Sequence, residues 1–342
     1  MVRGAGPYGS HAPAQPSRAL QVAPATAPST PHRTDPGTSL DWLWIPITIA
    51  AALFQSLRTA LQKFLKGRLS TNGSTFTRFV FGLPVAAAYV GVLAAAGVPL
   101  PSPGPDFFAW VLLGGVAQIL ATALLIHVLG FRNFPVGVAY SKTEVVQAAL
   151  FGFVFLGDQV TALGAAAVAA GTAGVMLFSV TQGDRPIHAL LSGLTERPAL
   201  LGIASGAFFG VAAVGFRGAS LSLDHPSVPM SAAYALAWAT GLQTLLLGTY
   251  LAWRERDQFA RIVAAWRPSL LAGLASVAGS ACWFTAMTLR PVAHVRTLGL
   301  IELVFTFLLS AVWFRERPSG REVAGIGLLA VAIVLILNAP GP

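Results

Sequence analysis

Long apolar runs alternate with short polar breaks along most of the chain from residue 42 onward. A helix needs about 20 apolar residues to cross the hydrocarbon core of a bilayer, and the runs have about this length. They predict ten membrane-spanning helices near residues 44–64, 77–97, 107–129, 135–156, 161–179, 199–220, 229–252, 269–289, 291–313 and 321–338. Run length also favours helices over a barrel, because barrel strands alternate over about ten residues. We therefore expect an all-α membrane protein.

The ten predicted helices divide into two groups of five. The polar stretch 181–198 separates a first repeat, residues 44–180, from a second repeat, residues 199–338. From Arg132 and Arg290 onward the two halves align without a gap at an offset of 158 positions. An odd number of spans in each half turns the second half upside down relative to the first. This pattern predicts two inverted five-helix repeats, an arrangement common in secondary transporters.

Two acidic residues fall near the centres of predicted spans, at equivalent places in the two halves. Glu144 and Glu302 lie 158 positions apart, and each precedes another acid by 14 positions, Asp158 or Glu316. A carboxylate in the middle of a membrane costs about 2.5–3.5 kcal/mol on insertion scales. We therefore expect these two glutamates to have a function or a partner inside the protein.

Composition supports a membrane protein and excludes several other classes. The chain is 55% hydrophobic and 10% charged, with a mean hydropathy of +0.68, whereas soluble domains are about 25% charged. The single cysteine, Cys282, excludes an internal disulfide and a cysteine-based metal cluster. Residues 1–40 hold seven prolines and no apolar run, so we expect a disordered N-terminal tail.

The net charge of +9 does not indicate nucleic-acid binding, because most basic residues fall in loops or the tail, where they would meet anionic lipid headgroups. Basic loops usually face the cytoplasm. The odd-numbered loops carry twelve basic residues, namely Lys66, Arg68, Arg132, Arg185, Arg197, Arg254, Arg256, Arg261, Arg267, Arg315, Arg317 and Arg321. We therefore predict that these loops are cytoplasmic and that both termini lie outside.

The chain resembles the EamA-like branch of the drug/metabolite transporter superfamily in a motif near the end of each half. The two halves read TEVVQAALFGFVFLGDQVTALGAAAVAAGTAG and IELVFTFLLSAVWFRERPSGREVAGIGLLA. Each has the family's order of an acid, an apolar stretch, a second acid, a tight turn and a glycine-rich last helix. Glu144 and Glu302 match the first acid, and Asp158 and Glu316 match the second.

This resemblance covers roughly residues 44–338. It implies two repeats of five helices and a secondary transporter, often an exporter of amino acids, metabolites or drugs. Lys63 and Arg78 fall where the family often has basic residues in its first and second helices. Val145 and Leu303 stand where the family usually has proline, so the sequence does not predict the kink expected at those positions.

The fourth predicted span carries a stripe of polar and aromatic residues. Residues three, four and seven apart share one face of a helix. The stripe is either the lining of a polar cavity or a buried cluster that locks two helices. Glu302 has mostly apolar neighbours along its own span, and it is either a second working acid or a structural partner. We prefer Glu144 as the working acid, in a stripe made of Tyr140, Ser141, Glu144, Gln147 and Phe151.

Three basic residues inside spans accompany the two acids. Lys142 lies about 12 Å into its span and points about 200° away from Glu144 on a continuous helix. We expect Lys142 to pair with an acid on another helix, Glu302 being the obvious one, rather than to snorkel. Arg58 clamps a substrate carboxylate or phosphate, neutralises Glu144, or snorkels as a surface arginine. Arg296 lies within two turns of the start of its span and has either an interfacial role or a substrate contact.

Two further arginines, Arg78 and Arg217, lie near span ends, and we interpret them as anchors or gate residues. The slight surplus of cations over acids within the spans predicts an anionic or zwitterionic substrate. The substrate and coupling-ion site is therefore assigned to seven residues, Arg58, Tyr140, Lys142, Glu144, Gln147, Arg296 and Glu302.

These observations predict a multi-pass inner-membrane transporter that moves a small organic metabolite or drug, as an exporter, by alternating access around a central polar cavity. The alternatives are a facilitator that needs no ion and, from a different class, a membrane-embedded lipid-modifying enzyme. The sequence has no phosphate-binding loop and no metalloprotease or nucleophile-elbow motif. We expect no enzymatic activity, no cofactor and no metal. The expected partners are the small-molecule substrate and membrane lipids, and the chain works as a monomer or a homodimer.

Overall fold

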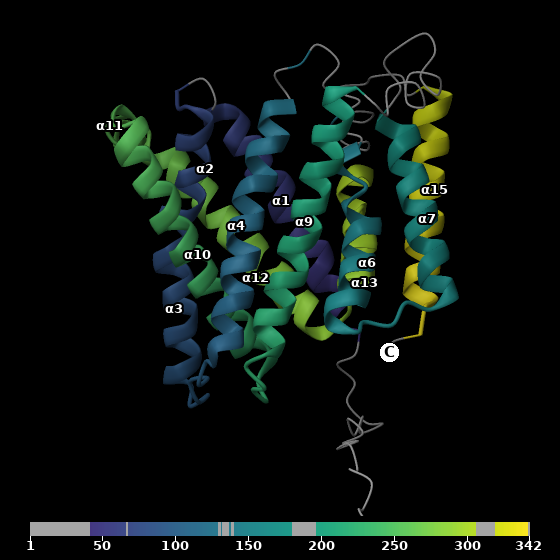
Figure 1. The fold of residues 1–342 in the computed structure, drawn as a ribbon, viewed down its shortest axis with the longest axis horizontal. Helices are drawn as coiled ribbons and strands as arrows, with labels where there is room; N and C mark the ends of the chain where they lie inside the picture. Colours follow the sequence, from purple (N-terminus) through teal and green to yellow (C-terminus); the bar gives the residue numbers. More distant parts are fainter. Residues whose placement is uncertain are drawn as a thin grey trace, which may run out of the picture. The chain divides into compact units, whose positions relative to one another are not determined.

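The computed structural model describes residues 42–65, 68–128, 131, 137, 140–179, 196–305 and 319–340. The predicted tail and most of the predicted linker at 181–198 lie outside these residues, as does Glu316. Within the described part, helices stand side by side with roughly parallel axes (Figure 1).

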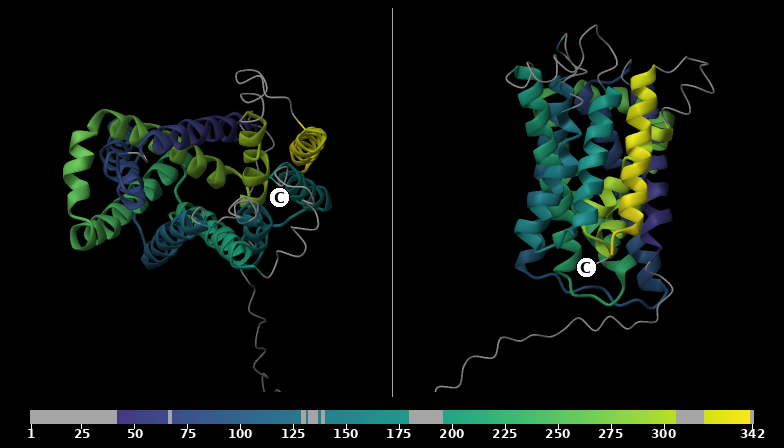
Figure 2. Two further views of the ribbon diagram at one scale, coloured as in Figure 1. Left: turned by 90° about the horizontal axis from the view of Figure 1, so that it is seen from above. Right: turned by 90° about the vertical axis from the view of Figure 1, so that its right-hand side faces the viewer.

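In the first half, the chain forms six helices within the described residues. They are α1 (Trp44–Leu65), α2 (Thr71–Val80), α3 (Gly82–Ala95), α4 (Pro105–Val128), α6 (Glu144–Leu156) and α7 (Ala162–Ser179). In the second half the described helices are α9 (Arg197–Leu221), α10 (Val228–Arg254), α11 (Asp257–Ala264), α12 (Trp266–Leu289), α13 (Val292–Gly299) and α15 (Gly320–Asn338). Seen from above, α7 and α15 lie at one edge and α10 and α11 at the opposite edge (Figure 2).

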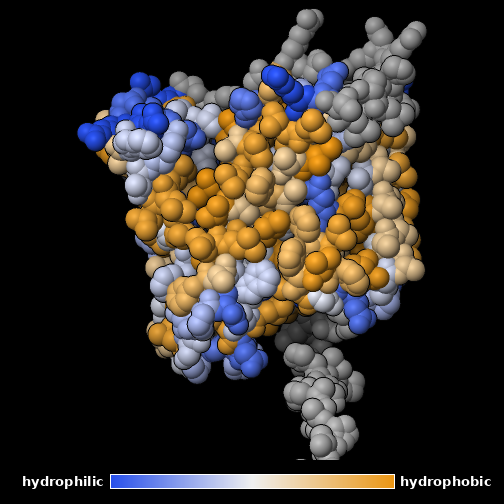
Figure 3. Space-filling model, viewed as in Figure 1, coloured by the Kyte–Doolittle hydropathy of each residue, from blue (hydrophilic) through white to orange (hydrophobic). Residues whose placement is uncertain are grey.

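Several helices are long and apolar enough to cross a membrane. Six segments in the described part meet this criterion, namely Thr71–Ala95, Pro105–Val128, Arg197–Leu221, Val228–Arg254, Trp266–Leu289 and Gly320–Asn338. Their outward side chains form a mostly hydrophobic band between two more hydrophilic ends (Figure 3). The protein is therefore a multi-pass membrane protein, as the apolar runs predict.

Small residues bring neighbouring helices into backbone contact. A Cβ atom placed on Gly215 of α9 would lie 2.8 Å from the Cα atom of Gly114 on α4. A Cβ atom on Gly174 of α7 would lie 2.9 Å from the carbonyl oxygen of Gly325 on α15. Helix association in lipid relies on such close packing, because burial from water contributes little there. Larger residues at these positions would push the paired helices apart.

The fourth predicted span is broken just before Glu144. Tyr140 and Ser141 are helical, Lys142 and Thr143 form a turn, and α6 begins at Glu144. Thr143 bonds locally, since its hydroxyl donates to the carbonyl oxygen of Tyr140 at 2.6 Å. Such local bonds compete with the helix. The prediction of one continuous helix over 135–156 is therefore wrong, and the break forms without a proline at Val145.

The ninth predicted span has a break at the equivalent place. Helix α13 ends at Gly299, Leu300 forms a turn, and residues 301–305 are helical again, with Glu302 the second of them. Leu300 lies 158 positions after Lys142, which is the offset that relates the two glutamates. In both halves, a glutamate therefore follows an interruption of the helix within two residues.

The short helix α11 is amphipathic and was not among the predicted elements, because its apolar run is too short to span a membrane. It is held to the start of α2 through side chains near its own start. The backbone N–H of Ser70 donates to Gln258 Oε1 at 2.8 Å. Glu255 accepts hydrogen bonds from the Ser70 hydroxyl at 2.5 Å and from Asn72 Nδ2 at 2.7 Å. These contacts fix one hydrophilic end of the molecule.

Candidate functional site

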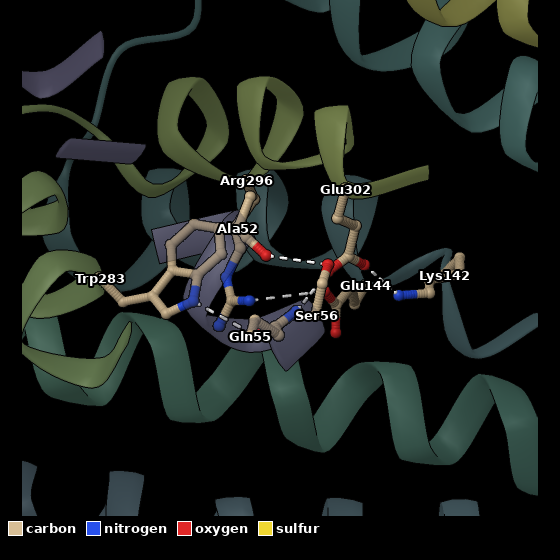
Figure 4. A network of polar contacts seen from close by, with 8 residues as sticks. All are labelled: Ala52, Gln55, Ser56, Lys142, Glu144, Trp283, Arg296 and Glu302. Carbon is tan, nitrogen blue, oxygen red and sulfur yellow. Dashed lines mark hydrogen bonds and ion pairs between the residues drawn. The ribbon is translucent and has the colours of Figure 1, made fainter. Parts of the chain in front are cut away.

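Two ion pairs lie close together where α1, α6, α13 and the helical segment 301–305 meet (Figure 4). Lys142 Nζ lies 2.7 Å from Glu302 Oε1, and Arg296 Nη1 lies 3.6 Å from Glu144 Oε1. We call these four residues, together with Gln55 of α1, the charged centre. Its four charged side chains are between 14% and 26% exposed, so the pairs are largely buried within the protein.

Glu302 accepts hydrogen bonds from two other parts of the chain. Gln55 Nε2 donates to one carboxylate oxygen at 2.5 Å, and Lys142 Nζ donates to the other at 2.7 Å. The predicted pairing of Lys142 with Glu302 is confirmed. The expectation of mostly apolar surroundings for Glu302 is wrong, because α1 and the turn before α6 supply polar partners that its own span does not contain.

Trp283 of α12 connects the two halves of the charged centre. The guanidinium of Arg296 lies over the indole ring, 5.0 Å from its centroid. The indole N–H donates to Gln55 Oε1 at 3.1 Å, and Gln55 in turn donates to Glu302. Gly299 makes room for this ring, because a Cβ atom at that position would lie 2.4 Å from the indole carbon Cη2. Each acid is thus linked to the other through side chains of three helices.

The helix break explains how Lys142 and Glu144 both reach the charged centre. On a continuous helix the two would point about 200° apart. The turn at Lys142 and Thr143 removes this constraint, so the expectation that they face different directions is wrong. Glu144 is the first residue of α6, where the helix dipole favours a carboxylate.

Arg58 of α1 lies near the charged centre but has no ion pair within 4.0 Å among the described residues. It is attracted by Glu302 and repelled by Arg296, and its buried Nε atom has no hydrogen-bond partner. Among the alternatives for Arg58, neutralisation of Glu144 is therefore wrong, because Arg296 is the cation that lies beside Glu144. With Arg58 included, three cations face two acids.

Tyr140, Glu144 and Gln147 do not lie on one face of a continuous helix. The break lies between Tyr140, which is 7% exposed, and Glu144, so helical spacing does not align them. Gln147 Nε2 donates to Thr143 Oγ1 at 3.2 Å and to the carbonyl oxygen of Ile203 at 3.4 Å. Its amide therefore faces α9 and supports the turn rather than the ion pairs.

Arg217 belongs to a second buried junction. Its Nη2 lies 3.0 Å from Asp158 Oδ1, and its Nη1 donates to the carbonyl oxygens of Met287 and, at 2.9 Å, Arg290. The arginine is 9% exposed, so a lipid-facing anchor role is wrong. The junction ties the turn after α6 to α9 and to the end of α12.

The seven site residues assigned from the sequence do not include Gln55 and Trp283, although one signal pointed to Gln55. Gln55 lies three positions before Arg58 and therefore shares its helix face. Nothing in the sequence near Trp283 indicates the arginine above its ring, because that contact depends on how α12 and α13 pack. In the described part, no group of three or more histidine, cysteine, aspartate or glutamate side chains is arranged to hold a metal ion.

Comparison with known proteins places the second half of the chain. Residues 197–338 match the EamA-like transporter family, which supports the resemblance indicated by the motifs in this half of the chain. A solved crystal structure, described simply as that of a protein, is similar in fold with a TM-score of 0.60 at 18% identity. The similarity covers 86% of this chain and 96% of the other. A search of curated proteins gave no match.

Proposed function

We propose that this multi-pass membrane protein, whose residues 197–338 match the EamA-like transporter family, is a secondary active transporter of a small organic metabolite or drug. The observation that carries the proposal is the charged centre. Replacing buried ion pairs by packed apolar residues is often neutral or stabilising, so folding alone does not require them. Charged groups inside a membrane protein usually mark a substrate or ion pathway.

The proposed architecture is ten helices in two inverted repeats, with the site between them. The equivalent helix breaks at Lys142 and Leu300, each followed by a glutamate, support this arrangement. Interrupted helices at corresponding positions of two halves are typical of transporters that bind their substrate near the middle of the membrane. Alternating access then exposes the charged centre first to one side of the membrane and then to the other.

In this proposal the substrate exchanges with an internal ion pair. Lys142 and Glu302 neutralise each other in the empty site, which offsets the cost of burying both charges. A zwitterionic substrate would present its amino group to Glu302 in place of Lys142. Arg296 and Glu144 form the equivalent second pair, while Tyr140 and Gln147 support the helix break. We assign the leading role to Glu302 rather than Glu144, because Glu302 has more polar partners.

We further propose that the protein is located in the inner membrane and exports its substrate as a monomer or homodimer. The test is metabolite profiling of culture medium from a deletion strain and from strains that overexpress the wild type or a variant. Glu302→Gln removes the charge of the proposed site. Asp257→Asn is the matched control, because Asp257 forms an exposed pair with Arg261 on α11.

The proposal predicts that a small organic compound accumulates several-fold in the medium with the wild type and Asp257→Asn, but not with Glu302→Gln at equal protein level in the membrane. Identical profiles in the deletion and wild-type strains would contradict it. If the concentration of the compound in the medium never exceeds its concentration in the cell, the ion-independent facilitator is indicated. A change confined to the membrane lipids would indicate a lipid-modifying enzyme.

A further inference from the structure

A small polar cavity lies between α2, α4, α10 and α12, and its described lining shares no residue with the charged centre. Its volume of about 10 Å³ is close to what a single water molecule needs. Phe79, Leu236 and Phe284 contribute apolar walls. The polar lining consists of Arg78, Gln118, Thr240, Gln243, Ser276 and Ser280.

Among the described residues that line the cavity, Arg78 alone is charged. It is 7% exposed, and its buried Nε atom has no hydrogen-bond partner. No ion pair within 4.0 Å joins it to an acid of the described residues, and its guanidinium rests over the ring of Phe79, 4.8 Å from the centroid. A buried charge without a counter-charge is costly. The cavity therefore has an excess positive charge.

The neighbouring lining groups are amides and hydroxyls rather than carboxylates. Gln243 is 2% exposed, and its Nε2 donates to Gln118 Oε1 at 2.7 Å and to the carbonyl oxygen of Gly115 at 3.4 Å. The hydroxyls of Ser276 and Ser280 come from successive turns of α12. A guanidinium with nearby amide and hydroxyl donors suits the oxygens of an anion, because charge-assisted hydrogen bonds are the strong ones.

The distribution of charge between the two sites singles out this cavity. Lys142 and Arg296 already have carboxylate partners in the charged centre. Arg58 and Arg78 have none, and they lie close enough on α1 and α2 to repel each other. An anion near Arg78 would supply the missing counter-charge and would reduce the repulsion between Arg58 and Arg78. The anionic part of a substrate is therefore attracted more strongly here than to the neutralised pairs.

We propose that the cavity around Arg78 binds the carboxylate of the transported molecule, as a site separate from the charged centre. This inference rests on the proposed transport function and names its substrate class as small organic carboxylates. The cavity has room for about one water in this conformation, so the carboxylate enters as α2 moves relative to α12.

The test measures binding by the purified full-length protein in a neutral detergent. Sodium acetate replaces sodium chloride at constant ionic strength, and the unfolding temperature is followed by scanning fluorimetry. We expect a saturable rise in unfolding temperature for the wild type. Arg78→Gln should weaken the apparent affinity for acetate at least tenfold, and Arg78→Lys should weaken it less.

Arg254→Gln is the matched control, because Arg254 lies at the end of α10 over the exposed ring of Trp253. It should bind acetate like the wild type. Equal acetate affinity in Arg78→Gln and Arg254→Gln would overturn the proposal, as would a wild type that responds no more to acetate than to chloride. A rise that depends on Arg78 but requires added phosphatidylglycerol would assign the site to a lipid headgroup and also overturn it.

This binding assay does not require transport. Acetate binding that depends on Arg78, without any exported compound, would contradict only the proposed function. Export without such binding would contradict only the carboxylate site.

Discussion

At the scale of residues, the two glutamates differ in their partners. Glu302 accepts from Gln55 and Lys142 at 2.5 and 2.7 Å, whereas the nearest cation to Glu144 is Arg296 at 3.6 Å. Removing one member of a buried pair leaves the other charge without compensation, which costs more than removing both. The structural and functional roles of Glu302 are therefore separable by experiment.

The first prediction concerns Glu302 and Lys142 together. Glu302→Gln should lower the free energy of unfolding by about 3 kcal/mol, because it leaves Lys142 uncompensated. Adding Lys142→Met to this variant should recover much of the lost free energy of unfolding without restoring transport. Chemical or thermal unfolding of the purified variants checks the stability, and the export assay checks the function. Strictly additive losses in the double variant would contradict the ion pair.

A second prediction concerns Gly299, which gives room to Trp283. Gly299→Ala should displace the indole from Arg296 and destabilise the protein by about 1–3 kcal/mol through overpacking. The control is Gly327→Ala on α15, where an added Cβ meets nothing within 4 Å. An exposed helical glycine replaced by alanine gains up to about 1 kcal/mol. Equal unfolding midpoints for the two variants would show that Trp283 is not confined as described.

Part of the site could be predicted at this scale. The cost of lone charges in a membrane was sufficient to predict that Lys142 pairs with Glu302. The roles of Trp283 and Arg78 could not be predicted, because each depends on which helix lies beside it. The apolar run places Arg78 near a span end, whereas α2 begins at Thr71 and buries Arg78.

At the scale of elements, the two helix breaks are the features that position the site. Run length predicted the helices well, because the thickness of a bilayer fixes how many apolar residues a span needs. The breaks at Lys142 and Leu300 lie inside apolar runs without proline, so hydropathy does not reveal them. Helix α11 was missed for the converse reason, since it lies at a hydrophilic end and has no long apolar run.

The third prediction concerns the junction of α6, α9 and α12. Asp158→Asn keeps the size of the side chain but leaves the buried Arg217 without a counter-charge. It should destabilise the protein by about 3 kcal/mol. Asp257→Asn, which breaks an exposed pair, should cost less than about 1 kcal/mol. Unfolding of both variants under one condition makes the comparison, and equal losses would contradict a buried junction.

At the scale of the whole molecule, charge separates the two hydrophilic ends. The end that carries α11 holds Arg254 and Arg267, each over a neighbouring tryptophan ring, as interfacial residues are. The end of α15 at Asn338 lies at the opposite end of the molecule from α11 (Figure 1). Basic loops face the cytoplasm, so the structure and the loop charges together predict an outward C-terminus.

The fourth prediction is this orientation. A C-terminal alkaline phosphatase fusion should be active, because that enzyme folds only outside the cytoplasm, whereas a green fluorescent protein fusion at the same place should be dark. The same pair of reporters inserted after Arg256 should give the reverse result. A fluorescent C-terminal fusion would contradict the predicted orientation.

In the proposed transport cycle, the charged centre opens alternately to the two sides of the membrane. Ser56 of α1 lies beside it, and its hydroxyl donates to the carbonyl oxygen of Ala52 (Figure 4). With the lone Cys282 replaced by alanine, Ser56→Cys places a single thiol at the site. Ser102→Cys, in the exposed loop between α3 and α4, is the control that reports leakage of reagent.

The most direct measurement labels these single thiols with a membrane-impermeant reagent, in right-side-out and inside-out vesicles. Alternating access predicts that Ser56→Cys is labelled from both sides and Ser102→Cys from the outside only. Labelling of Ser56→Cys from one side alone, or from neither, would contradict the account.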